Sequence, residues 1–105
     1  MSVTDLHEIA VKYARRDAEE YVRDGRPFGG CGFAWVEVYG VKLSTKVGKE
    51  FAKVGFRKNY GGGLRLSNPS GLATQDAAAL LAGAEKYAEI FRNAGYTAYA
   101  VSRMD

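Results

Sequence analysis

The segment from residue 31 to residue 39 constrains the fold more than any other part of the chain. It contains one charged residue, Glu37, together with the only Trp and the only Cys of the protein. Successive side chains of an extended strand alternate between its two faces, so Phe33 and Trp35 share one face. The opposite face carries smaller apolar residues, Ala34, Val36 and Val38. Because neither face is polar before Glu37, we predict a central strand that is buried on both sides.

Length and composition predict one globular domain. The chain has 105 residues, of which 47% are hydrophobic and 26% are charged, values typical of a folded domain with a single modest core. One cysteine cannot form an internal disulfide. The sequence contains no apolar run of the roughly 20 residues needed to span a membrane, and no signal-peptide core near residue 1. We therefore expect a soluble, intracellular protein of one domain, residues 1–105.

Three helices are predicted from apolar residues that recur every three or four positions. The first covers residues 4–24, with Ser2 or Thr4 as its cap, and the last covers about 75–93, opened by Thr74. A short helix over 45–54 contains Gly48, which lowers helix propensity by about 1 kcal/mol relative to Ala. The sequence Ala82-Gly83-Ala84 should let the last helix approach the sheet closely. The predicted structural core comprises Phe33, Trp35, Val36, Phe51, Leu80, Ala84 and Phe91.

The remaining segments complete an α+β fold. Residues 56–60 and 63–67 are predicted to form two strands around a tight turn at Gly61-Gly62, and residues 96–101 alternate as a closing strand. After the helix at 4–24, the order over 28–105 is β-α-β-β-α-β, which is the ferredoxin-like, or split βαβ, sandwich. If 56–60 is a loop, a three-stranded variant remains. The sheet face away from the helices is then available to the first helix or to a partner.

The residues that could carry catalysis are few. Cys31 would need a base to act as a nucleophile, and His7 is the only histidine. An apolar strand raises the pKa of a thiol, so Cys31 is predicted to be buried and unreactive. One His and one Cys do not make a zinc site. The sequence therefore predicts no catalytic residues, no metal ligands and no cofactor, and it favours a binding function over an enzymatic one.

Positive charge is concentrated in residues 42–65. This segment holds seven Lys and Arg residues and one acidic residue, a net charge of +6, while the whole chain carries +3. Such a cluster is typical of a site for nucleic acid or another anionic partner, for instance an acidic protein. Phe33 or Trp35 could add base stacking if the sheet face is open. The predicted partner-binding residues are Lys46, Lys49, Lys53, Arg57, Lys58, Tyr60 and Arg65.

Two other functions remain open at the level of sequence. Aromatic residues make up 12% of the chain, seven of them Tyr, and Tyr and Trp are enriched where proteins meet. The protein could therefore bind another protein or associate with itself through an aromatic surface. Alternatively, a small ligand or an enzyme site could lie near Gly61–Gly63, between sheet and helix.

Several motifs together give a resemblance to a known group of proteins. They are CGFAWV at 31–36, YGGG at 60–63, NP at 68–69, AGA at 82–84 and AYAVSRMD at 98–105. In this combination, residues 28–105 resemble a family of small tailed-bacteriophage proteins of unassigned function. Members often carry Trp immediately before Asn-Pro, where this chain has Ser67. The resemblance implies a phage accessory protein in the cytoplasm of an infected bacterium, and it implies no particular activity. It also implies that an acidic protein partner, or a protein bound through the aromatic surface, would be a host protein.

Overall fold

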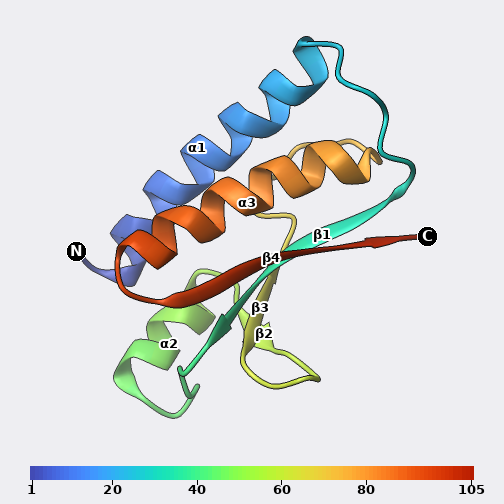
Figure 1. The fold of residues 1–105 in the computed structure, drawn as a ribbon. Helices are drawn as coiled ribbons and strands as arrows, with labels where there is room; N and C mark the ends of the chain where they lie inside the picture. The colour runs from blue at the N-terminus through green and yellow to red at the C-terminus, as the bar shows by residue number, and fades with distance from the viewer.

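A computed structural model describes residues 1–105 and confirms the α+β class (Figure 1). Three helices and one antiparallel sheet of four strands make up the chain. The elements are α1 (Val3–Arg23), β1 (Gly32–Tyr39), α2 (Lys46–Lys53), β2 (Arg57–Lys58), β3 (Leu64–Ser67), α3 (Ala77–Asn93) and β4 (Thr97–Met104). The strand order is β2-β3-β1-β4. Part of the predicted segment 56–60 therefore does form a strand, β2, and the three-stranded variant is wrong.

Strand β1 lies at the centre of the sheet, but its two neighbours cover different lengths of it. It pairs with β4 along its whole length, from Gly32 opposite Met104 to Tyr39 opposite Thr97. With β3 it pairs only from residue 35 to residue 38, and Trp35 lies opposite Ser67 at the end of that ladder. The first residues of β1 therefore have a strand on one side only. The closing strand also continues three residues beyond its predicted end.

Each helix begins at a side chain that caps its first turn. Ser2 accepts a hydrogen bond from the Asp5 amide at 3.1 Å, as one of the two predicted caps of α1. The cap of α3 is Asp76, not Thr74, and the helix begins two residues later than predicted. The reason is local, because Thr74 Oγ1 accepts from the Asp76 amide and forms a turn before the helix. Asp76 also accepts from the Gly29 amide at 2.9 Å, which fixes the approach to β1.

The helices lie on one side of the sheet. Figure 1 shows α3 running along β1 and β4, with α1 beside α3. Gly83 of α3 does permit a close approach of another element. The sequence predicted that this element would be the sheet, but Gly83 faces α1. A Cβ at this position would lie 3.0 Å from the carbonyl oxygen of Ala14.

His7 of α1 and Tyr87 of α3 share a 2.7 Å hydrogen bond, and burial lowers the pKa of His7 and raises the pKa of Tyr87. None of the helices has the length and apolar character needed to cross a membrane.

The core lies between the helices and one face of the sheet. Five of the predicted core residues are buried there, namely Val36, Phe51, Leu80, Ala84 and Phe91. Phe51 brings α2 onto the same face, where its ring packs 5.7 Å from the Phe91 ring. Two other predictions are wrong: Phe33 is 59% exposed, and Trp35 is only half-buried. Both point to the other face of the sheet, which no helix covers, so β1 is buried on one side only.

Candidate functional site

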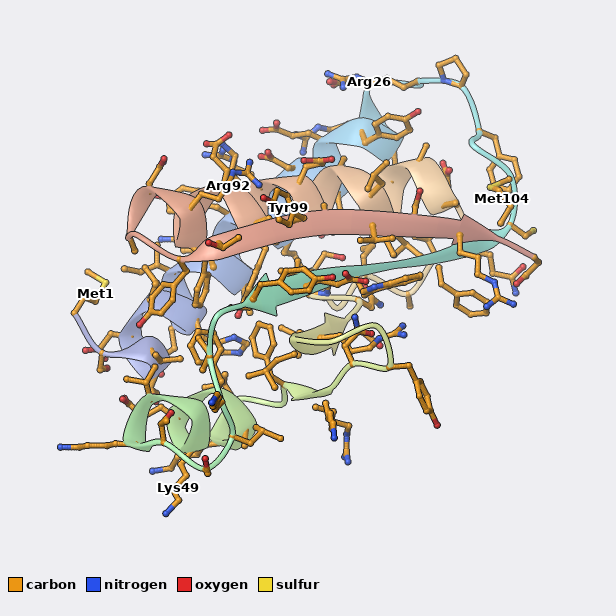
Figure 2. All side chains as sticks on the ribbon, turned by 60° about the horizontal axis from the view of Figure 1, so that its bottom comes forward. Met1, Arg26, Lys49, Arg92, Tyr99 and Met104 are labelled. Atoms are coloured by element: carbon orange, nitrogen blue, oxygen red, sulfur yellow. The ribbon has the colours of Figure 1, made fainter.

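The uncovered face of the sheet carries aromatic and charged side chains from all four strands. The alternation along β1 places Phe33, Trp35, Glu37 and Tyr39 on it. Cross-strand pairing adds Arg65 opposite Glu37, Arg57 opposite Arg65, Tyr99 opposite Glu37, and Arg103 opposite Phe33, because directly paired residues share a face. Figure 2 shows Tyr99 on β4. We call this set the sheet-face site: Phe33, Trp35, Glu37, Tyr39, Arg57, Arg65, Tyr99 and Arg103.

Glu37 occupies the middle of the sheet-face site and is held by its two neighbours on β1. Trp35 Nε1 donates to Glu37 Oε2 at 2.7 Å, and the Tyr39 hydroxyl donates to Oε1. Partial burial alone would raise the pKa of Glu37, but hydrogen bonds from Tyr39 and Trp35 and the charge of Arg65 outweigh burial, so its pKa is lowered. Glu37 is therefore ionised at neutral pH, and its charge is engaged by donors that fix the Trp35 and Tyr39 rings.

The rings and guanidinium groups of the site are arranged for stacking. The Arg65 guanidinium lies over the Trp35 ring, 4.2 Å from its centroid, and the Tyr39 and Tyr99 rings pack with centroids 6.2 Å apart. Phe33 and Tyr99 remain 59% and 53% exposed, so their surfaces are open to a ligand. Arg57, Arg65 and Arg103 supply three positive charges, and none of them takes part in an ion pair. Such a surface can stack flat rings and attract anions.

The structure divides the predicted basic residues between two surfaces. Arg57 and Arg65 lie side by side on the sheet-face site. Lys58 is paired with Leu64, whose side chain is buried on the helix-covered face, so Lys58 points to that side. Lys46, Lys49 and Lys53 are exposed on α2, which packs on the covered face, and Figure 2 shows Lys49 extending into solvent. No residue between 42 and 65 takes part in any of the five ion pairs.

The glycines between β2 and β3 build the turn itself. The Asn59 amide donates to the Gly63 carbonyl, which leaves residues 60–62 as the loop, one residue longer than the predicted turn. Gly62 and Gly63 have positive φ angles of 98° and 74°, a conformation that favours glycine. Tyr60 stands fully exposed in this loop. Beside Gly63 lies a hollow of about 350 Å³, lined in part by Lys42 and Lys58.

Cys31 is exposed, which contradicts the prediction of a buried thiol. Regular pairing of β1 begins only at Gly32, so Cys31 lies at the margin of the sheet. Its Sγ donates to Gln75 Oε1 at 3.6 Å. His7 is engaged with Tyr87, so each of the two residues considered for nucleophilic catalysis has another partner.

The exposure of Cys31 leads to the opposite of the reactivity predicted from sequence. We expect native protein to react with a disulfide reagent such as Ellman's at a rate within about tenfold of the denatured chain, because exposure removes the steric block. The absorbance of the released thiolate at neutral pH measures this rate. Cys31→Ser should abolish the signal, and a native reaction that waits for unfolding would contradict the exposed position.

Comparisons with models of protein families, with curated proteins and with solved structures find no match to this chain. The sequence prediction missed Glu37, Tyr39, Tyr99 and Arg103 as site residues. Their signal is the period of two: Glu37 and Tyr39 alternate with buried residues along β1, and Tyr99 and Arg103 lie on the matching face of β4.

Proposed function

We propose that this protein is a non-enzymatic binding module that holds a single-stranded nucleic acid across the sheet-face site. One observation carries the proposal: a sheet face that no helix covers presents exposed rings of Phe33 and Tyr99 beside Arg65 stacked on Trp35. Proteins that bind single strands combine aromatic side chains, on which bases stack, with cationic groups that follow the phosphates. Bases of a duplex are already stacked on one another, so a single strand fits this surface better.

Charge favours nucleic acid over a protein partner for the same face. The site has three arginines without ion pairs, and its one carboxylate, Glu37, is already engaged by two donors. A polyanion complements this arrangement, whereas an apolar protein surface would leave the arginines desolvated. The lysines of α2 add positive charge outside the face, which we assign to attraction of the phosphate backbone.

We further propose that the fold is ferredoxin-like and that the protein comes from a bacteriophage. The strand order β2-β3-β1-β4 and the alternation of strands and helices after α1 support a ferredoxin-like arrangement with α1 as an added helix. An RNA-recognition domain of that arrangement stacks bases on its two central strands. Here the rings lie on β1 and β4, and β3 contributes Arg65. The resemblance to phage proteins supports an accessory role in an infected bacterium, which stays a prediction.

Removing one exposed ring should weaken binding without weakening the fold. We expect Phe33→Ala to raise the Kd for a labelled single-stranded oligonucleotide by about 5- to 150-fold, the range expected when one base can no longer stack. Fluorescence anisotropy with single- and double-stranded DNA and RNA measures the effect. Phe28→Ala is the matched control, because Phe28 is 64% exposed but lies in the connection before β1, outside the sheet.

Charge and stacking can be separated by salt. Replacing Lys46, Lys49 and Lys53 together with Gln should lower the slope of log Kd against log salt by about 0.7 for each phosphate that these lysines neutralise, and Phe33→Ala should leave that slope unchanged. The proposal fails if wild type binds no single strand at low salt. A larger mass in solution, lowered to that of a monomer by Phe33→Ala, would then identify the face as a contact between copies of the chain. A monomeric wild type would leave an acidic host protein as the partner to seek.

A further inference from the structure

A notch opens at one end of the sheet-face site, where β3 stops before β1 does. The ladder between the two strands ends at Ser67 opposite Trp35, and Asn68, with a positive φ of 42°, turns the chain away before Pro69. Strand β1 continues alone on this side to Gly32. The space between it and the segment 67–76 is a hollow of about 370 Å³, continuous with the face proposed to hold the nucleic acid.

The backbone of β1 offers an acceptor and a donor to this notch. On the same side, the Gly32 amide donates to the Gln75 carbonyl at 3.1 Å, and the Ala34 carbonyl accepts from the Asn68 amide at 2.9 Å. The N–H and C=O of one residue of a strand point to the same side, so the Gly32 carbonyl and the Ala34 amide also face the notch. Neither the Gly32 carbonyl nor the Ala34 amide takes part in a backbone hydrogen bond to the segment that follows β3. The wall of the notch therefore carries a free acceptor and, two residues further along β1, a free donor.

The other walls suit a flat ring with a polar edge. Phe33, Trp35 and the Arg65 guanidinium border the notch on the side of the open face, and Leu80 of α3 borders it on the covered side. Polar side chains complete the lining, namely Ser67, Asn68, Thr74, Gln75 and the acidic Asp105. Every nucleobase has a donor next to an acceptor on its edge, and the two rings of a purine give the larger area for stacking on Trp35 and Phe33.

We infer that the notch takes one unstacked purine base, whose edge is hydrogen-bonded by the Gly32 carbonyl and the Ala34 amide. The inference rests on the proposed function and adds base preference to it, because the sheet face supplies stacking without sequence readout and the notch supplies the readout. The same purine chemistry could come from a base of a bound strand or from a free purine nucleotide, and titration with each separates these sources.

Trp35 is the only tryptophan, so its fluorescence reports directly on the notch. The protein is titrated with an oligothymidylate, with the same strand carrying one central adenine or guanine, and with free AMP and GMP. We expect the single purine to tighten binding at least about fivefold, the lower end for one recognised base edge, and to change Trp35 emission. Ser67→Leu, which fills the notch, should remove this advantage while oligothymidylate affinity and the melting temperature stay unchanged.

Ser102→Leu is the matched control, because Ser102 is exposed on β4 and does not line the notch. A purine advantage that survives Ser67→Leu, or that is absent from wild type although oligothymidylate binds, overturns the inference and leaves the proposed function standing. A third outcome is that AMP or GMP quenches Trp35 fluorescence saturably, that Ser67→Leu abolishes this quenching, and that no strand binds. This outcome supports the purine notch and overturns the proposed function. Binding of neither strands nor nucleotides overturns both.

Discussion

Replacing Phe51 with Ala is expected to lower the free energy of unfolding by about 3–5 kcal/mol, a large fraction of the stability of a small domain. The Phe51 side chain is fully buried. Its ring centroid lies 5.0 Å from that of Phe56 and 5.2 Å from that of Tyr96. Helix α2 has only eight residues, too few to be stable by itself, and Phe51 is its main anchor to the core. Truncation therefore leaves a cavity and also loosens α2.

Urea denaturation followed by circular dichroism measures this destabilisation, and Phe33→Ala provides a stringent control. Both substitutions remove the same atoms, and sequence patterning predicted both rings to be core. Phe33 is 59% exposed, so its truncation should cost no more than about 1 kcal/mol. Equal destabilisation of the two variants would mean that the uncovered face is buried in solution, and a Phe51→Ala protein as stable as wild type would contradict the packing of α2.

Local sequence patterns predicted the elements well because the forces that define them are local. The apolar stripe of the first helix and the side chain of Ser2 specify α1, which begins one residue before its predicted start. The glycine after the last helix, Gly95, has a positive φ of 98° and ends α3 in the usual way. The α+β class follows from the order of these elements, and it needs no knowledge of which surfaces meet.

The candidate site could not be predicted in the same way, because it depends on which face of the sheet is left uncovered. An apolar strand such as β1 is compatible with burial on two sides or with an aromatic surface on one. The distinction lies in where α1 packs, and it packs on α3. The three arginines of the site, Arg57, Arg65 and Arg103, lie on three different strands, and only the register of the sheet brings them to one face.

Two glycines inside helices show the same limit. Gly48 looked like a defect of α2 by propensity, but a Cβ there would overlap the Lys42 carbonyl oxygen, so the chain before the helix requires a glycine. Gly83 lies in the contact between α1 and α3, where a Cβ would lie 3.0 Å from the carbonyl oxygen of Ala14. A Cβ at position 83 would lie 2.8 Å from the Cβ of Ser70, which is itself buried. Neither close contact can be read from the sequence. Gly48 contacts the loop before its own helix, and Gly83 contacts residues that are distant along the chain.

Gly83→Leu is expected to separate α1 from α3 and to cost about 3 kcal/mol or more. Helix propensity favours Leu over Gly, but the Leu side chain must displace the Ala14 backbone, which belongs to a helix and cannot yield locally. The packing of Ala10, Ala14 and Ala18, all fully buried, would be disrupted together. Urea denaturation and amide hydrogen exchange of residues 3–23 measure the effect. Gly61→Leu, at a position with nothing within 4 Å, should be nearly neutral, and an unchanged α1 in Gly83→Leu would contradict this packing.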